Sequence, residues 1–284
     1  MKGPHRPAAR IALLLAAVLV LFYGGLCAYM FFRQESYVFF PERTLTATPR
    51  TLGMAFEDVR LCTHDGVAIH GWYVHREGAR GTLVFFHGNA GNLSDRVGKV
   101  RLFHDMGLNV LAVDYRGYGE SGGIASEEGT YADGAAAVAE AMRRQGDRQR
   151  LVFFGESLGG AVGVEAARRI HPGALVLESA FTSIPDMAKT LYPWLPVSRL
   201  LKIRYDSLDR MGGLSCPVMV LHSREDEIVP FEMGRRLYER APGPKVFQVL
   251  KGGHNDGGLL ASPEAQEVLR RFLEMHLSEP LAAP

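Results

Sequence analysis

Six short apolar runs, separated by stretches with helical character, constrain the fold of this chain most. They span residues 82–86, 109–113, 151–154, 174–177, 218–221 and 246–250. Near-continuous apolar runs of this length are typical of strands buried on both faces, which occur in parallel sheets covered by helices. The sequence therefore predicts an α/β fold with a mostly parallel central sheet flanked by helices.

Helical patterns fill the intervals between these runs. We expect helices at residues 92–106, 127–145, 158–170, 231–240 and 263–277. Before the first run, two segments alternate apolar and polar residues around Asp65-Gly66, which predicts an antiparallel hairpin from 56–61 and 67–75. Residues 181–214 interrupt the alternation with three prolines and the apolar string 191–197. Long structureless loops are uncommon in compact domains, so this segment is expected to form a small cap.

Composition excludes several classes of protein. With 32 Lys and Arg against 31 Asp and Glu, the net charge is +1, which does not favour nucleic-acid binding. Hydrophobic residues make up 47% of the chain and charged residues 22%, so a folded core is expected rather than disorder. The sequence predicts no cofactor and leaves the oligomeric state open.

Cysteine and histidine spacings do not predict a metal site. Cys27, Cys62 and Cys216 are too scattered for a disulfide framework or a zinc motif, and Cys62 and Cys216 are expected to be small buried side chains. The nearest approach to a metal cluster lies in the predicted hairpin, at His64, Asp65, His70 and His75. These four are expected to be polar positions on the hairpin surface.

Residues 11–32 form an uncharged run of 22 that predicts a transmembrane helix. As a helix the run would measure about 33 Å, enough for a hydrocarbon core of about 30 Å. A cleaved signal peptide is the alternative, but the run exceeds the usual apolar region and lacks a clear small-residue cleavage site. The predicted organisation is a short basic tail at 1–10, an anchor at 11–32 and one domain at 36–284.

Charge around this run indicates an orientation. Lys2, Arg6 and Arg10 precede it, whereas Arg33 alone follows at once. Positive flanks tend to stay in the cytoplasm, so the domain is expected on the exported side. Arg43 and Arg50 weaken this bias, because they nearly balance the count over a longer flank.

The segment Gly155-Glu156-Ser157-Leu158-Gly159 fits the pattern GxSxG. It comes directly after the apolar run 151–154 and before an alanine-rich helical stretch. Glycines on both sides allow a sharp strand-to-helix turn that lifts a serine hydroxyl out of the sheet. This context predicts that Ser157 is a nucleophile, whereas a plain glycine-rich turn would not explain the position between strand and helix.

A serine hydroxyl is a weak nucleophile near neutral pH, so a base and an orienting acid are needed. His254 lies in a Gly-Gly-His-Asn-Asp turn just after the last apolar run and is the predicted base. Asp226 is the predicted acid, because it stands in the middle of a turn that closes with Val229-Pro230. Its competitors, Glu225 and Glu227, are expected to face solvent.

The loop 87–91, His-Gly-Asn-Ala-Gly, follows the apolar run 82–86. This is where a loop that stabilises an oxyanion belongs in such an arrangement. The backbone N–H groups of Asn89 and Leu158 are the predicted donors. His87 is expected to shape the loop rather than to take part in the chemistry.

Five strings together resemble the α/β-hydrolase superfamily over about residues 39–277. They are FFHGNAGN (85–92), DYRGYGESGG (114–123), GESLGG (155–160), HSREDEIVP (222–230) and GGHND (252–256). With the N-terminal anchor, the chain resembles the membrane-attached subgroup that includes eukaryotic α/β-hydrolase-domain proteins, some of which hydrolyse lipids or protein palmitate. The resemblance implies that Asp114 buttresses the oxyanion loop. Where many relatives have His-Gly before the acid turn, this chain has His222-Ser223.

These features predict a membrane-anchored serine hydrolase that cleaves ester or thioester bonds through an acyl-enzyme on Ser157. Lipid or acylated substrates are favoured, since the cap carries apolar side chains suited to an acyl chain. They are Leu191, Tyr192, Trp194 and Leu195. A carboxylesterase for small esters and a non-catalytic binding module at the membrane are the alternatives. A peptidase is less favoured, because no second domain large enough to gate a peptide channel is evident.

Overall fold

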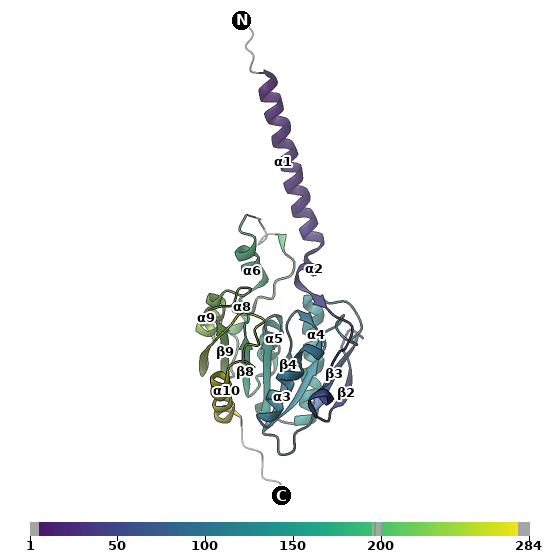
Figure 1. Cartoon of the computed structure of the whole chain (residues 1–284), viewed down its shortest axis with the longest axis vertical. Coiled ribbons are helices and arrows are strands. Elements are labelled where there is room, and N and C mark those ends of the chain that lie inside the picture. Colours follow the sequence, from purple (N-terminus) through teal and green to yellow (C-terminus); the bar gives the residue numbers. More distant parts are fainter. Residues whose placement is uncertain (1–5, 195, 197–199, 278–284) are drawn as a thin grey trace.

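The computed structural model describes residues 6–194, 196 and 200–277. Its centre is an eight-stranded sheet with the order β10-β9-β8-β7-β4-β6-β3-β2 (Figure 1). Neighbouring strands from β10 to β6 run parallel, while β3 is antiparallel to both β6 and β2. The predicted α/β fold with a mostly parallel sheet is therefore confirmed.

All six predicted apolar runs are strands, and so are both arms of the predicted hairpin. The strands of the sheet are β2 (Glu57–Cys62), β3 (Ala68–Val74), β4 (Gly81–Phe86), β6 (Leu108–Val113), β7 (Leu151–Glu156), β8 (Ala174–Glu178), β9 (Val218–Ser223) and β10 (Lys245–Leu250). Two further short strands, β1 (Phe40–Pro41) and β5 (Ala90–Gly91), pair with each other outside this sheet.

The helices around the sheet follow the predicted pattern closely. They are α3 (Val97–Asp105), α4 (Glu127–Gln145), α5 (Leu158–Ile170), α9 (Phe231–Arg240) and α10 (Pro263–His276). The prediction differs most at 92–106, where a 3₁₀ turn (Leu93–Arg96) precedes α3. The Asn92 side chain caps this turn by accepting a hydrogen bond from the Ser94 N–H. This cap favours a 3₁₀ turn that begins before α3 and is separate from it.

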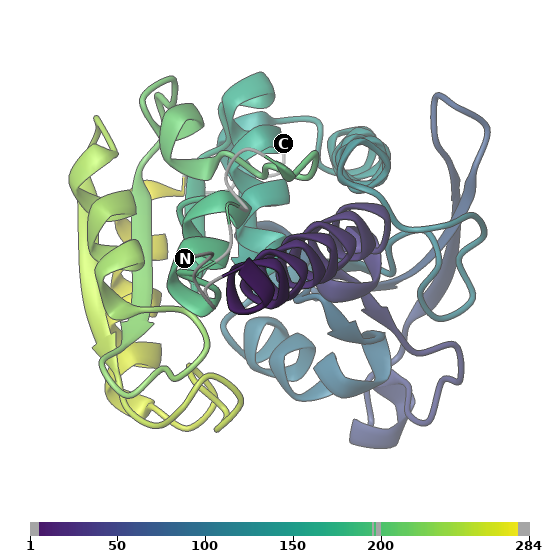
Figure 2. The ribbon, with the colours of Figure 1, turned by 90° about the horizontal axis from the view of Figure 1, so that it is seen from above.

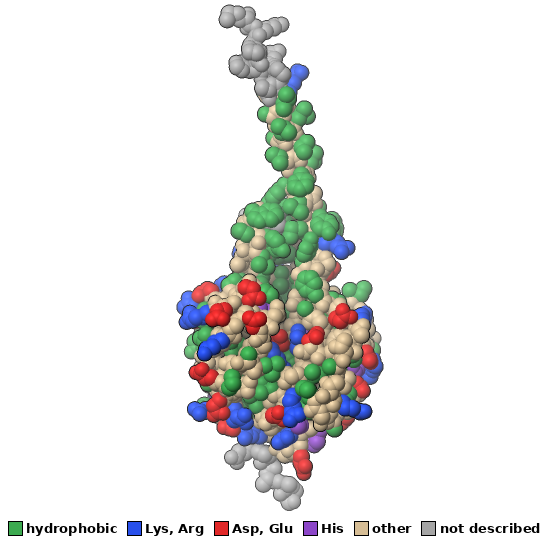
Figure 3. Space-filling model, in the orientation of Figure 1, with side chains coloured by type: hydrophobic (Ala, Val, Ile, Leu, Met, Phe, Trp, Pro, Cys, Tyr) green, Lys and Arg blue, Asp and Glu red, His purple; other side chains and the backbone are tan. Residues whose placement is uncertain are grey.

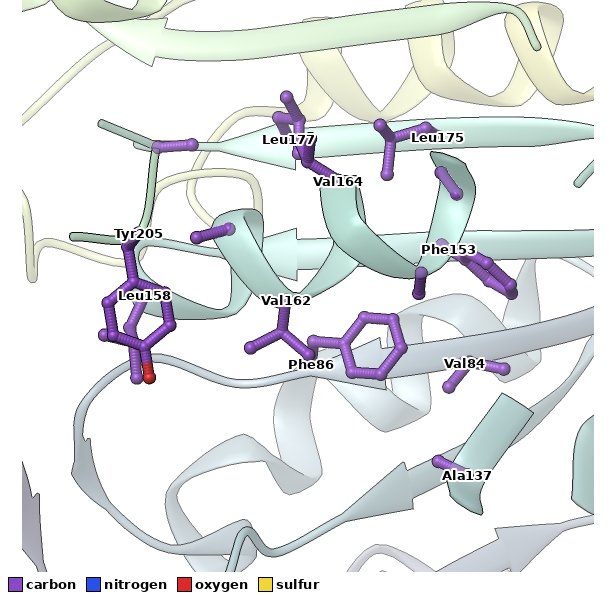
Figure 4. Close-up of a cluster of buried hydrophobic side chains, with 14 of the residues drawn as sticks. Val84, Phe86, Ala137, Phe153, Leu158, Val162, Val164, Leu175, Leu177 and Tyr205 are labelled. Atoms are coloured by element: carbon purple, nitrogen blue, oxygen red, sulfur yellow. The ribbon is translucent and has the colours of Figure 1, made fainter. Parts of the chain in front are cut away.

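Side chains that alternate along β4 explain how the sheet is covered on both faces. Val84 and Phe86 pack into one core with α4, α5 and α9, whereas Leu83 and Phe85 pack into another with α3 and α10. Figure 4 shows the first of these cores, with Phe86 beside Val162 of α5 and Phe153 further along the sheet. Both faces of the central strands are thus buried under helices, as their continuous apolar runs require.

The N-terminal helix α1 (Arg6–Phe32) projects from the domain. Seen from above, it rises over the middle of the domain rather than beside it (Figure 2). Its segment Ala9–Phe32 has a mean hydropathy of 2.6 and is exposed along most of its length, while Cys27, Met30 and Phe31 near the domain are half-buried. By length and composition it is able to cross a membrane. The short helix α2 (Gln34–Val38) joins it to the domain.

The segment 181–214, which we name the cap segment, contains α6 (Ile184–Leu191) and α8 (Ser207–Met211). Figure 1 shows α6 at the end of the domain from which α1 leaves. The buried Tyr205 fixes the returning chain, since its hydroxyl lies 2.7 Å from the Thr130 hydroxyl of α4. The segment therefore has its own helices and fixed contacts.

Two minor predictions were wrong. Cys62 is exposed, whereas Cys216 is buried as expected, and both are free thiols. His70 is buried rather than on the hairpin surface, with its Nε2 atom 2.9 Å from Asp58 Oδ1. It lies where β3 is covered by the Tyr115–Ser121 turn, and Ser121 Oγ accepts a bond from its N–H group. β2 is the edge strand of the sheet, so Cys62 stays exposed. β3 lies between β2 and β6, so His70 is covered.

Candidate active site

Ser157 stands on a strained turn between β7 and α5. Its backbone angles are φ 51° and ψ −114°, a combination that residues other than glycine rarely adopt. The Ser157 N–H donates to the Glu178 carbonyl at 2.9 Å, and the Ser157 carbonyl accepts from the Gly160 N–H at 2.9 Å. These bonds hold the turn, which leaves the side chain at the carboxyl edge of the sheet.

Glycines around Ser157 are needed for close approach. A Cβ atom on Gly159 would lie 2.0 Å from the Phe86 carbonyl oxygen, and one on Gly155 would lie 2.5 Å from the Gly159 carbonyl oxygen. Gly160 would meet the Cβ atom of Ala180 at 2.6 Å. The start of α5 therefore rests directly on the backbone that leaves β4, which brings Ser157 beside the loop 87–91.

The predicted acid and base are in contact. His254 Nδ1 lies 2.8 Å from Asp226 Oδ2, and the other carboxylate oxygen accepts from the N–H groups of Ile228 and Val229 at 3.0 and 2.7 Å. Burial alone would raise the pKa of Asp226, but the bonds from His254 and Val229 outweigh it and lower that pKa. Asp226 is thus an ionised acceptor that fixes the orientation of the imidazole.

The competing glutamates are exposed, as expected, and each also accepts a backbone hydrogen bond. Glu227 accepts a bond from the His254 N–H at 3.0 Å, and Glu225 accepts one from the Gly252 N–H at 3.0 Å. Both bind the backbone of the histidine loop while Asp226 binds the ring. The three consecutive acidic residues therefore hold one loop together.

The loop 87–91 approaches Ser157 from the end of β4. A Cβ atom built on Gly88 would lie 3.7 Å from Ser157 Cβ. Leu158 is the first residue of α5, so its N–H group has no acceptor within the helix. Among the backbone bonds of the described chain outside helices and strands, neither the Asn89 nor the Leu158 N–H has an acceptor. Both predicted donors are therefore free to bind a developing oxyanion.

Contacts behind this loop fix its shape. Tyr118 donates its hydroxyl to the Asn89 carbonyl at 2.6 Å, and Tyr115 donates to the His87 carbonyl at 3.1 Å. Asp114 accepts a bond from the Leu93 N–H at 3.0 Å. His87 is fully buried, with its ring Nδ1 atom 2.7 Å from the Gly88 carbonyl oxygen. These side chains lie behind the loop, and burial lowers the pKa of His87 to about 3, so its ring is neutral.

Ser157 and His254 open onto one cavity of about 410 Å³. No hydrogen bond joins the two side chains in the described structure, but both line this space with Gly88, Asn89 and Leu158. Ser157 is 8% exposed, and the His254 side chain 10%. The structure therefore brings all three predicted polar side chains and both predicted N–H donors to one edge of the sheet.

The predicted cap residues divide into three groups. Leu191 and Tyr192 line the cavity. Trp194 does not, since it is 60% exposed and its ring lies beside that of Tyr192. Leu195 lies outside the described residues. Helix α6 adds Ile184, Met187 and Ala188 to the lining, which the sequence analysis did not single out.

Comparison with known proteins shows which family this chain belongs to. The family described as serine aminopeptidase, S33, matches residues 77–205. An uncharacterised protein of Mycobacterium tuberculosis is 39% identical over 267 residues, which cover 92% of this chain and 95% of the relative. The α/β-hydrolase domain-containing protein WAV2 of Arabidopsis thaliana is 32% identical over 92% of this chain and 96% of its own. The chain belongs to the α/β-hydrolase superfamily.

Other relatives place this α/β hydrolase among hydrolytic enzymes. A lysophosphatidylserine lipase of Mus musculus is 32% identical over 221 residues, which cover 67% of this chain and 55% of the lipase. An esterase of Pyrococcus furiosus shares the fold, with a TM-score of 0.70 at 21% identity over 85% of this chain and 98% of the esterase. The chain is a hydrolase, and the resemblance drawn from the five sequence strings is confirmed.

Sequence reasoning missed a buried ionic cluster of the hydrolase just behind Ser157. Lys99 Nζ lies 2.6 Å from Glu178 Oε2 and 3.0 Å from Glu156 Oε2, and Arg96 Nε lies 3.6 Å from the same Glu156 atom. Burial opposes ionisation of Glu156, but the charges of Lys99 and Arg96 lower its pKa overall. Glu178 also accepts the Leu259 N–H at 2.7 Å. The cluster thus ties the serine turn to the histidine loop.

His222 was also missed, because only its place before the acid turn was noted. Its ring is fully buried, and Nε2 donates to the Val229 carbonyl at 2.9 Å. This bond closes the turn that holds Asp226. Gly234 of α9 allows the approach, since a Cβ atom there would lie 2.3 Å from His222 Nδ1. The available signal was a histidine at the end of an apolar run, four residues before Asp226.

Proposed function

We propose that this chain is a membrane-anchored serine hydrolase that cleaves ester or thioester bonds of lipid or acylated substrates. One observation carries the proposal: the Asp226–His254 bond of 2.8 Å and the strained Ser157 meet at one cavity. A catalytic Ser-His-Asp set needs this arrangement, in which the acid orients the imidazole and the imidazole faces the nucleophile.

The first half of the reaction forms the acyl-enzyme. The Ser157 hydroxyl oxygen attacks the acyl carbonyl carbon while His254 Nε2 accepts its proton. The carbonyl oxygen becomes an oxyanion, which the N–H groups of Asn89 and Leu158 stabilise. When the bond to the leaving alcohol or thiol breaks, the imidazolium returns that proton to the leaving group.

The second half releases the acid. A water molecule gives a proton to His254 and attacks the acyl carbonyl, and the Ser157 oxygen leaves with the proton that His254 returns. Asp226 remains ionised throughout, since its role is to hold the ring and to stabilise the imidazolium. The products are a carboxylic acid and an alcohol or thiol, and the enzyme is regenerated.

The domain organisation supports a membrane setting. Residues 11–32 form the proposed anchor, residues 36–284 the hydrolase domain, and 181–214 the cap inserted in it. The flanking charges of Lys2, Arg6 and Arg10 favour a cytoplasmic N-terminus and an exported domain. A site held at the membrane suits substrates that reside there.

Hydrolysis of p-nitrophenyl acyl esters of increasing chain length by the full chain in detergent tests this function. We expect turnover of at least one ester, and its loss in Ser157→Ala. Ser215→Ala is the matched control, because Ser215 is exposed and contacts His171 far from the cavity. Equal activity of wild type and Ser157→Ala would contradict the proposal.

Two companion measurements separate the alternatives. Aminoacyl p-nitroanilides test the peptidase activity that the description of the matched family suggests. A fluorophosphonate probe should label Ser157 whether or not a substrate has been found, because it reports on the activated hydroxyl alone. Absence of labelling in a folded protein would favour the non-catalytic binding module.

A further inference from the structure

The end of α1 nearest the domain forms one wall of the catalytic cavity. Cys27, Met30 and Phe31 of this helix line the same space as Ser157 and His254. The span Ala9–Phe32 would measure about 36 Å as a helix, against about 30 Å for a hydrocarbon core. The last turns of α1, which carry these three residues, therefore lie at the membrane boundary on the side of the domain.

Specific bonds fix this wall in place. Gln34 is buried at the start of α2, and its side-chain oxygen accepts from the Lys202 and Ile203 N–H groups at 2.8 and 3.1 Å. Its amide nitrogen donates to the Phe31 carbonyl at 2.7 Å. Because a buried amide with these partners holds a single orientation, the helix is locked to the cap segment rather than loosely tethered.

A second set of contacts joins α1 to the cap segment and α2 to the oxyanion loop. Tyr23 donates its hydroxyl to the Trp194 carbonyl at 3.1 Å. The side chain of Asn89 donates to the Val38 carbonyl at 2.8 Å. Helix α2, which directly follows α1, thus connects it to the loop that holds the predicted oxyanion donors.

The lining is polar near the reacting atoms and apolar towards α1 and the cap segment. Leu191, Tyr192, Leu200 and Leu201 face the cavity along with the three residues of α1. Leu191 and Trp194 of the cap segment also expose apolar surface to the surroundings of the domain. Figure 3 shows hydrophobic side chains running from α1 onto the adjoining end of the domain, while charged side chains gather on the body below.

We infer that the substrate is a long-chain acyl ester of a membrane lipid whose acyl chain lies between the end of α1 and the cap segment. This inference rests on the proposed function and names its substrate class. The ester reaches Ser157 sideways from the leaflet, so the chain never has to cross water. Helix α1 is then a part of the acyl site as well as an anchor.

Substitution at neighbouring positions of α1 tests this inference in the full chain reconstituted into phospholipid nanodiscs. Cys27→Trp fills the lining, whereas Ala28→Trp places the same side chain on the exposed side of the helix. We expect Cys27→Trp to lower kcat/KM for a palmitoyl ester roughly tenfold or more and to spare a butyryl ester. Ala28→Trp should change neither.

Equal effects of the two substitutions, or an equal loss on both esters in Cys27→Trp, would overturn the inference. Fluorophosphonate labelling of Ser157 in each variant shows that the site has formed. If Ser157→Ala retains the wild-type activity, the proposed function fails instead, so the two failures are distinguishable.

A second measurement needs no bulky substitution. In a Cys62→Ser background, Cys27 is the remaining thiol outside the domain core, because Cys216 is buried. We expect a long-chain alkyl fluorophosphonate bound to Ser157 to slow the reaction of Cys27 with N-ethylmaleimide, and a methyl analogue to leave it unchanged. Equal reaction rates with the two probes would place the acyl chain elsewhere and refute the inference.

Discussion

The side chains of Asp226 and His254, 28 residues apart in the chain, meet at 2.8 Å between Oδ2 and Nδ1. Asp226→Asn would offer an amide N–H or a weaker acceptor to the ring and would favour the wrong tautomer. We expect kcat to fall by a factor on the order of 10⁴, with little change in thermal stability. Ester hydrolysis and circular dichroism measure the two effects.

Glu225→Gln is the control for that substitution. Its side chain binds the Gly252 N–H, and glutamine keeps an oxygen acceptor there. We expect activity within about tenfold of wild type, because a neutral acceptor weakens only one backbone bond. If Glu225→Gln lost as much activity as Asp226→Asn, the assignment of the acid would be wrong.

The serine turn predicts a difference between two glycines of α5. In Gly159→Ala the new methyl group would meet the Phe86 carbonyl oxygen at 2.0 Å, whereas in Gly163→Ala it would meet Leu175 at 3.4 Å. We expect Gly159→Ala to destabilise the protein by about 3 kcal/mol or more, or to prevent folding. Gly163→Ala should be tolerated, since 3.4 Å is near van der Waals contact. Thermal unfolding in detergent checks both, and equal melting temperatures would contradict the geometry.

The buried ionic cluster predicts a large effect of one lysine of α3. Lys99→Met would leave the buried carboxylate of Glu178 without a cation and Glu156 with only the more distant Arg96, at a cost of about 3–5 kcal/mol. Arg101→Met on the same helix is the control, because its pair with Asp105 is exposed and contributes about 1 kcal/mol at most. Chemical denaturation should separate the two variants, and a similar midpoint for both would refute the prediction.

Asp114 predicts a pH dependence of stability. Burial raises its pKa to about 7, whereas an unfolded aspartate titrates near about 3.9. Across this interval the folded state binds a proton that the unfolded state has released, so stability falls as pH rises. Asp114→Asn cannot ionise and keeps an acceptor for the Leu93 N–H.

We therefore expect Asp114→Asn to gain stability relative to wild type at about pH 8 and to match it at about pH 4. The lowered pKa of His87, whose Nε2 atom lies 3.5 Å from Asp114 Oδ1, produces the opposite slope, but its ring is neutral in both folded proteins at both pH values, so its contribution cancels in the comparison. Melting temperatures at the two pH values decide the matter. A constant difference between the proteins would mean that Asp114 does not titrate in this interval.

The proposed orientation can be tested with the natural thiols. Cys62 is exposed on the domain, while burial raises the pKa of Cys216 to about 11 and keeps it unreactive. A membrane-impermeant maleimide should therefore label Cys62 in intact bacterial spheroplasts that express the full chain. Cys62→Ser gives the background signal. Labelling that appears only after permeabilisation would place the domain in the cytoplasm.

Local sequence was sufficient to predict the sheet, most helices and the serine turn. Each of these depends on residues close in the chain: apolar runs that need two dry faces, and glycines that allow the turn at Ser157. The order of polar residues after successive strands also predicted which side chains would meet. The carboxyl ends of parallel strands lie at one edge, so residues after β4, β7, β9 and β10 converge there.

The tertiary structure alone decided what surrounds these residues. Lys99 pairs with Glu178 across 79 positions, and Gln34 with Ile203 across 169. No local sequence pattern predicts either pair. The partner of a buried ion or amide is the group that tertiary packing brings next to it, wherever that group lies in the chain. The same reason explains why α1 was predicted as an anchor but not as a wall of the cavity. Hydropathy reports that a helix can enter a membrane, whereas its contacts with the domain depend on where the folded chain directs it.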